Sequence, residues 1–387
     1  MLGIYRETHM DRMKKSRAVK ATLEVLIVLS VAGTAAWLTL WKTASPPPAT
    51  LTIKFRVDAG PWKSDTAIYP LKGQRVTLKV DEIAGGIPRW YQIIPDISKI
   101  YQNCNHPWEP DAYKWVGFAK IDYSRKELVG CRGRWEIEPF SSVSHQRGAG
   151  RVLSSLSVGI DPAAETPHYH EDVGTFWYEV EVERDGRTER SPGLEDLDKR
   201  GLPSRVFRVS VREGDGYLGY LTSFFNVPGV FGSIPYQSSN YIGVDCCDAL
   251  VAAYGKWKGK PIEKDYNVDT LVARLPRLAE LNVVNGKPDK WLIWGKDVRP
   301  GDFIAVRFRG ADRYQHIGAL YSDKDSNGVL SEDDLVLHAG PLPLRHSHLQ
   351  DGFFDGHVVI LDPQLSLLPS RDNPLLQYAK EIMYLFK

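Results

Sequence analysis

The chain has 387 residues, of which 43% are hydrophobic and 25% are charged, and its formal net charge is +1. These values are typical of a globular protein with room for two ordinary domains and a tail. The near-neutral charge excludes the strongly basic surface of a typical nucleic-acid-binding protein, so no nucleic-acid partner is expected.

The chain begins with a basic segment, residues 1–20, that carries six lysine and arginine side chains. An apolar segment follows at residues 21–42, and Val25 to Trp41 contains no charged residue. This pattern predicts a single membrane-spanning signal anchor with the basic tail in the cytoplasm. A cleaved signal peptide is the alternative. Both hypotheses place the rest of the chain at the outer side of a cytoplasmic membrane, in a periplasmic or extracellular location.

A short proline-rich linker, residues 43–50, leads into a region whose hydrophobic residues alternate with polar ones. Alternation of this kind predicts half-buried strands. The expected strands lie at 51–57, 76–80, 174–182 and 206–211. Residues 51–213 are therefore expected to form a β-sandwich-like extracytoplasmic domain. In an oxidising compartment the two cysteines of this region, Cys104 and Cys131, are expected to form a disulfide.

Near the middle of the chain, Asp245 and Cys246 precede an apolar run with helical spacing. Asp245 is a favourable N-cap residue, which places Cys246 in the first turn of a helix. Unpaired N–H groups and the helix dipole stabilise a thiolate there. This position indicates a nucleophile, although most helical cysteines serve only in packing.

The region after this helix combines a second helix with four strands, which is an α+β layout. The helix is expected at 268–281 and the strands at 302–308, 316–321, 335–338 and 358–361. His316 begins one strand and His338 ends the next. If these two strands pair antiparallel, both imidazoles lie close together, and a base and its orienting group are then available to a thiol.

Four sequence blocks resemble the NlpC/P60 clan of papain-like cysteine peptidases. They are Gly-Val-Asp-Cys (243–246), Arg-Pro-Gly-Asp-Phe (299–303), His-Ile-Gly-Ala-Leu (316–320) and Leu-His-Ala-Gly (337–340). The resemblance implies a papain-like catalytic domain over residues 214–366, with a helix packed on an antiparallel sheet. It implies Cys246 as nucleophile, His316 as general base and His338 as its orienting residue.

The resemblance also suggests two substrate-binding residues, Tyr236 and Asp245, and bacterial cell-wall peptides as the substrate. The family has Ser-Gly after its cysteine, whereas this chain has Cys247-Asp248. An alignment on the following Leu-Val would make Cys247 the nucleophile. Cys246 is preferred because Asp245 precedes it as in the family motif.

An insertion between the two histidine strands, residues 323–334, has the spacing of an EF-hand calcium loop. Glycine occupies position 6, and the oxygen ligands expected for a structural Ca²⁺ ion are Asp323, Asp325, Asn327, Val329 (through its carbonyl), Ser331 and Asp334. A polar hairpin loop is the alternative, because the same residues favour turns.

Together these features predict a membrane-anchored extracytoplasmic cysteine hydrolase that cleaves amide or peptide bonds, in peptidoglycan or envelope peptides, through a Cys-His-His triad. Two other functions remain open: a non-catalytic envelope-binding protein on the same scaffold, and a papain-like acyltransferase. A final helix is expected at 367–387, and the sequence indicates no oligomeric state.

Overall fold

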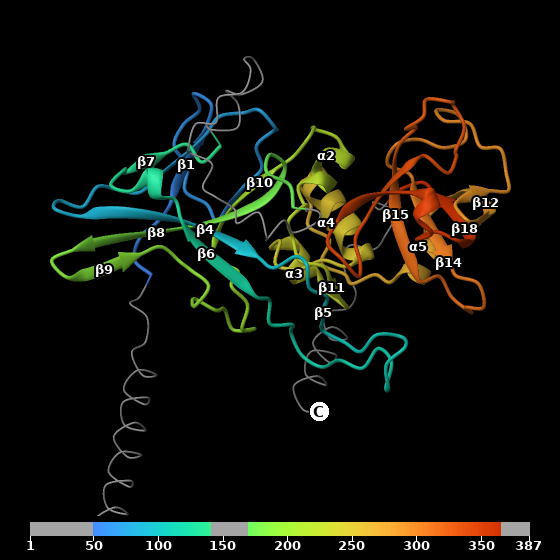
Figure 1. Ribbon diagram of the computed structural model, residues 1–387, viewed down its shortest axis with the longest axis horizontal. Coiled ribbons are helices and arrows are strands. Elements are labelled where there is room, and N and C mark those ends of the chain that lie inside the picture. Colours follow the sequence, from blue (N-terminus) through green and yellow to red (C-terminus); the bar gives the residue numbers. More distant parts are fainter. Residues whose placement is uncertain (1–48, 141–168, 365–387) are drawn as a thin grey trace, which may run out of the picture. The chain divides into compact units, whose positions relative to one another are not determined.

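The computed structural model describes residues 49–140 and 169–364 (Figure 1). The predicted cytoplasmic tail, the predicted membrane helix at 21–42 and the predicted helix at 367–387 lie outside the described residues. Within the described ranges, no helix combines the length and the apolar composition that crossing a membrane requires.

The first part of the described chain is built of short strands. In chain order they are β1 (Lys54–Val57), β2 (Ala67–Ile68), β3 (Val76–Lys79), β4 (Ile87–Pro95), β5 (Tyr101–Gln102), β6 (Tyr123–Glu127), β7 (Glu136–Ile137), β8 (Gly174–Arg184), β9 (Arg187–Arg190) and β10 (Phe207–Val211). One sheet has the order β1-β3-β7, and a larger one has the order β2-β10-β8-β4-β6, with β9 paired to β8. The β2–β10 pair is parallel, whereas the other pairs of these two sheets are antiparallel.

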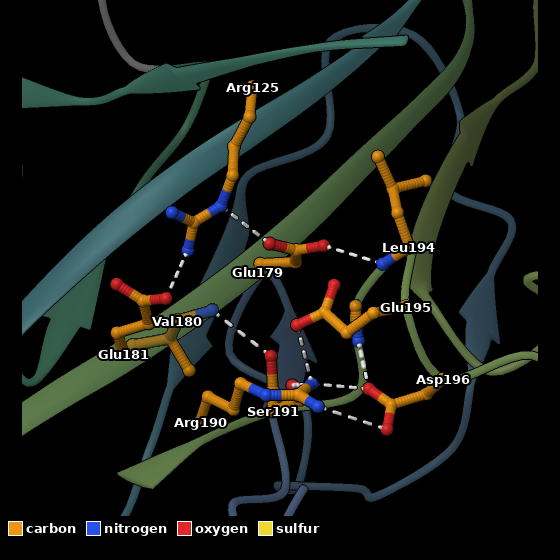
Figure 2. A network of polar contacts seen from close by, with 10 residues as sticks. Arg125, Glu179, Val180, Glu181, Arg190, Ser191, Leu194, Glu195 and Asp196 are labelled. Carbon is orange, nitrogen blue, oxygen red and sulfur yellow. Dashed lines mark hydrogen bonds and ion pairs between the residues drawn. The ribbon is translucent and has the colours of Figure 1, made fainter. Parts of the chain in front are cut away.

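Figure 2 shows a network of polar contacts on the larger sheet. Arg125 of β6 contacts Glu179 and Glu181 of β8 at 2.8 and 2.7 Å. Arg190, at the end of β9, pairs with Asp196 in the following loop. Glu179 is only 5% exposed, and a buried carboxylate of this kind requires a partner. The network therefore ties β6, β8, β9 and the loop after β9 together.

The second part of the chain adds the helices and another sheet. Its elements are α2 (Tyr217–Thr222), β11 (Val230–Phe231), α3 (Pro235–Ser239), α4 (Cys246–Lys258), α5 (Val268–Arg274), β12 (Arg277–Val284), β13 (Lys287–Pro288), β14 (Phe303–Arg307), β15 (His316–Ser322), β16 (Leu335–His338), β17 (Arg345–His348) and β18 (Gly356–Leu361). The sheet has seven strands in the order β13-β12-β18-β14-β15-β16-β17, and every pair is antiparallel.

Strand alternation divides the side chains of this sheet between two cores. Phe303 and Ile317 belong to the core that contains Leu250 of α4. Ile304 and Leu320 belong to a second core on the opposite face. Burial of both faces explains why these strands read as nearly continuous apolar runs in the sequence.

The predicted fold class, a papain-like α+β domain preceded by a β-sandwich-like domain, is wrong. The described residues are mostly β, with 34% in strands and 13% in helices, and they contain a curled antiparallel half-barrel sheet. One cause is the segment predicted as a helix at 268–281. Pro276 has no N–H to donate and clashes with a preceding helical turn, so α5 ends at Arg274 and residues 277–284 form β12.

The main core also draws on strands from both parts of the chain. Ile93 of β4 and Trp177 of β8 lie in the same buried cluster as Leu250 of α4. β5 and β11 pair in parallel, with Val230 opposite Tyr101. These contacts join the segment before α4 to the N-terminal sheets, and they position the start of α4.

Candidate active site

The start of α4 is shaped by its capping residue. The Asp245 carboxylate accepts a hydrogen bond from the Asp248 N–H at 2.9 Å, which confirms the predicted N-cap. The Asp245 N–H donates to the Ser233 hydroxyl oxygen at 2.9 Å, and that hydroxyl donates to the Asp248 carboxylate at 2.6 Å. These bonds place Cys246 at the first helical position.

The two predicted histidines are brought together. β15 and β16 pair antiparallel as expected, and His316 Nε2 lies 2.8 Å from His338 Nδ1. His338 Nε2 lies 2.9 Å from the Ser347 hydroxyl on β17. His338 is fully buried, and His316 is 9% exposed. The result is a hydrogen-bonded row, His316–His338–Ser347, across three neighbouring strands.

The histidine rings are held by close packing. The Phe354 ring lies 5.2 Å from the His316 ring and 5.4 Å from the His338 ring, measured between centroids. Gly318 makes room for this arrangement. A Cβ atom there would lie 2.9 Å from the His338 Cβ and 3.0 Å from the Phe354 ring. Any larger residue at 318 would therefore force the rings apart.

The environment of Cys246 favours its thiolate. Its pKa lies well below the ordinary thiol value, chiefly because Cys247 hydrogen-bonds it, and His316 and the backbone of Ile317 lower the pKa further. The pKa of Cys247 is raised well above its ordinary value by the same hydrogen bond and by burial. Cys247 is also only 3% exposed, within the main core. These differences favour Cys246 over Cys247 as the nucleophile.

The middle member of the row, His338, is neutral. Burial lowers the pKa of His338 well below its ordinary value, and the charges of His316 and Arg345 lower it further. A neutral His338 that donates from Nε2 to Ser347 presents an unprotonated Nδ1 to His316. His316 Nε2–H can then donate to it, so His338 is suited to fix the orientation of the His316 ring.

Two carboxyl groups stand beside the thiol. Burial is the main cause that raises the pKa of both Asp245 and Asp248 well above the ordinary value, and the mutual repulsion of nearby acids adds to it. Both shifts favour the neutral carboxyl group. Negative charge beside a Cys246 thiolate is thereby reduced.

Tyr236, the other predicted substrate-binding residue, is used elsewhere. Its hydroxyl donates to the Asp198 carboxylate in the loop after β9, and the Arg200 guanidinium lies over its ring. The sequence did not point to Ser233 or Ser347. Ser233 hydrogen-bonds the residues at the start of α4, and Ser347 hydrogen-bonds His338. Neither serine lies in an element that the sequence predicts, so nothing distinguishes these two from the other serines of the chain.

The predicted Cys104–Cys131 disulfide is absent, and all four cysteines of the chain are free. Cys104 lies against Gly232, where an added Cβ would come within 2.3 Å of its sulfur. Cys131 instead packs against the core of the N-terminal sheets. The prediction rested on cysteine count and compartment, which contain no information about these separate locations.

The 323–334 loop brings three acids together. In the part of the chain that the structure describes, Asp323, Asp325 and Asp334 form the group able to hold a metal ion, with ligand atoms within 4.8 Å of one another. Asp323 also accepts from the Gly328 N–H at 2.8 Å, which closes the loop. Asp334 accepts from the Trp294 indole N–H at 2.8 Å. The donor set of hard oxygens fits Ca²⁺, but Asp334 would have to share its carboxylate with the indole.

The other predicted ligands of the loop are in less direct positions. The Asn327 side-chain oxygen accepts from the Val329 N–H at 2.7 Å, and the Ser331 hydroxyl donates to Asp325 at 3.3 Å. A surface hollow of about 340 Å³ lies elsewhere and is lined by Glu213, Gly214, Leu218, Gly219 and Tyr321.

Comparisons with protein-family models, with curated proteins and with solved structures find no match for this chain. The function of this chain is therefore inferred from the geometry of the candidate site.

Proposed function

We propose that the protein is a cysteine hydrolase that cleaves amide or peptide bonds. The observation that carries this proposal is a thiol in the first turn of α4 that His316 hydrogen-bonds, while His316 Nε2 lies 2.8 Å from Nδ1 of a second histidine, His338. A nucleophile, a base and an orienting group in this order are the requirements of acyl transfer. The apolar core around Cys247 is packed without the His316–His338–Ser347 row, so packing alone does not explain why this polar row is present.

In the proposed reaction, the Cys246 thiolate attacks the carbonyl carbon of the scissile amide. Backbone N–H groups of the first turn of α4 lack intrahelical acceptors and can stabilise the oxyanion. His316, protonated, gives its proton to the departing amine, and a covalent thioester remains on Cys246. His316 then takes a proton from water as the water attacks the thioester, which releases the acid and restores the Cys246 thiolate and the protonated His316. His338 and Ser347 act as positioning residues that fix the His316 ring.

The sequence resemblance suggests the substrate, a bacterial cell-wall peptide, and the apolar segment at 21–42 suggests a membrane-anchored, extracytoplasmic location. For the 323–334 loop we propose a structural Ca²⁺ ion. Asp323, Asp325 and Asp334 would hold it, and the ion would stiffen the connection between the strands that carry His316 and His338.

The test is digestion of muropeptides and intact peptidoglycan by the wild-type chain and by Cys246→Ala, with mass spectrometry of the products. We expect hydrolysed peptides from the wild type alone. Addition of a free amine separates the two acyl-transfer reactions, because an acyltransferase would yield the new amide. Equal product from the Cys246→Ala chain would overturn the proposal.

A further inference from the structure

Strand β5 pairs with β11 (Figure 1), and the loop between β5 and β6 carries a stack of aromatic rings against Phe231 of β11. The His106 ring is stacked between two other rings. Its centroid lies 4.4 Å from that of Trp108, with an angle of 8° between the ring planes. Its centroid lies 4.3 Å from that of Phe231 of β11, with an interplanar angle of 26°. Trp108 is 74% exposed, so most of its indole faces solvent. We call Trp108, His106 and Phe231 the aromatic platform.

The platform is held in place by polar contacts. The Asn103 side chain donates to the Gln237 side-chain oxygen at 2.6 Å and to the Gly232 carbonyl at 3.0 Å, which fixes the start of the loop to α3 and β11. The Glu109 carboxylate accepts from the His106 N–H. Further along, Asp111 adopts a left-handed backbone, with a φ of 53°. A non-glycine residue in this region is uncommon and persists where surrounding contacts enforce it.

This exposed indole has no role in the core. A tryptophan stacked on only one face leaves its other face in water, and ordering it has an entropic cost with little compensating burial. Burial lowers the pKa of His106, which keeps the middle ring of the stack uncharged. The stack therefore presents a flat, rigid and uncharged face at the surface, a feature that marks a binding site.

The charges around the platform restrict the ligand. Glu109, Asp111 and Asp122 lie on the same loop as Lys114 and Lys120, and Lys114 is paired with Asp111 at 3.0 Å. The Arg313 guanidinium lies over the Tyr113 ring of this loop. Nucleic acids bind to aromatic platforms that are flanked by several unpaired basic side chains, which compensate the phosphates. The three acids and two lysines of this loop leave a small negative balance, which disfavours a polyanion and favours an uncharged ligand with a flat apolar face.

We propose that the aromatic platform binds a pyranose ring of an uncharged polysaccharide, stacked on the open face of Trp108. A pyranose in its chair form presents a patch of C–H groups, and these are attracted to the negative face of an aromatic ring. The sugar hydroxyls at the ring edge remain in water or reach the polar side chains of the loop. An open face without walls suits a polymer that extends in both directions.

The platform is continuous with the start of α4. Phe231 precedes Ser233 by two residues, and the Ser233 hydroxyl accepts from the Asp245 N–H. The inner end of the platform is thereby connected to the N-terminus of α4 through Ser233. Binding here makes no use of the thiol, so it stands or fails independently of the proposed hydrolase activity.

Isothermal titration calorimetry on the full-length Cys246→Ala chain tests this proposal. The probes are the β-1,4-linked pentasaccharide of N-acetylglucosamine, cellopentaose, and a thymidine decanucleotide. Trp108→Ala is compared with Trp291→Ala, which removes another indole, 78% exposed, from a different loop. Both indoles are mostly exposed, so each substitution removes little buried surface and both chains should melt within about 2 °C of the parent.

We expect at least one saccharide to bind, Trp108→Ala to weaken it by about tenfold or more, and Trp291→Ala to change it by less than about twofold. Three results would each overturn the proposal. They are no heat from either saccharide, equal losses in the two tryptophan variants, and Trp108-dependent binding of the oligonucleotide without saccharide binding.

Discussion

His316 Nε2 lies 2.8 Å from His338 Nδ1, although the two residues are 22 positions apart and a 12-residue acidic loop lies between their strands. Because burial keeps His338 neutral, its Nδ1 can accept a hydrogen bond from the His316 Nε2–H. This contact fixes the orientation of the His316 ring.

The first prediction concerns thiol reactivity. Iodoacetamide should alkylate Cys246 faster than an ordinary thiol near neutral pH, because the pKa of Cys246 is lowered and more of it is thiolate there. His316→Ala removes one cause of that lowered pKa and leaves the Cys247 hydrogen bond, so the pH at which the alkylation rate rises should move upward. Burial raises the pKa of Cys104 to about 11 and that of Cys131 above its ordinary value, so both should react slowly. A peptide map identifies the labelled residue, and preferential labelling of Cys247 would contradict the assignment.

The second prediction concerns the triad as a unit. Cys246→Ala and His316→Ala should each lower kcat by about 10³-fold or more, and the double variant should be little worse than either. His338→Gln should cost less, about 10- to 100-fold, because the base itself remains. Steady-state hydrolysis of the muropeptide substrate measures these effects. Additive losses would show that Cys246 and His316 act independently.

The third prediction concerns Ser347, which is 4% exposed. Ser347→Ala leaves the His338 Nε2–H without its acceptor in a buried site, which should cost about 1–3 kcal/mol of unfolding free energy. The same change should lower kcat more than it raises KM, because the orientation of His316 is loosened. Ser347→Thr keeps the hydroxyl and should restore kcat. If Ser347→Ala lowers the unfolding free energy but leaves kcat and KM unchanged, Ser347 has no part in positioning His316.

The fourth prediction concerns calcium. Saturating Ca²⁺ should raise the Tm of the wild type, because a ligand that binds the folded state stabilises it by mass action. Asp323→Ala combined with Asp325→Ala should abolish that increase. Asp333→Ala, an acid of the same loop outside the three-carboxylate group, is the matched control and should leave it intact. An unchanged wild-type Tm with Ca²⁺ would refute the calcium hypothesis.

The fifth prediction concerns acid stability. Burial lowers the pKa of His346 to about 4, so between about pH 6.5 and pH 4 the unfolded chain binds a proton there that the folded chain does not. Stability must therefore fall as the pH falls through this window, by about 1–2 kcal/mol at pH 5 from this residue. His346→Phe keeps a ring between Tyr321 and Phe225 and should reduce the loss. Urea unfolding at pH 7 and pH 5 measures it, and an equal loss in both chains would assign the effect elsewhere.

Local sequence signals determined much of the candidate site. The Asp245 cap, the helix that begins at Cys246 and the strands that carry His316 and His338 follow from capping chemistry and hydrophobic spacing, which act over a few residues. The same signals predicted the strands near 76–80, 174–182 and 206–211. The class of the fold was predicted incorrectly, because apolar spacing over 268–281 suits a helix as well as a strand. Because Pro276 interrupts the helix, the segment forms two elements, α5 and β12.

Only the tertiary structure decided which distant residues meet. The registration of β16 against β17 brings Ser347 to His338, and the approach of β11 to β5 places Phe231 against His106. In the tertiary structure Cys104 and Cys131 are also not bonded to each other, and the Tyr236 hydroxyl donates to Asp198. Such contacts depend on strand order and on the packing of a core shared by both parts of the chain. Residue types and spacing along the sequence do not encode these relationships locally.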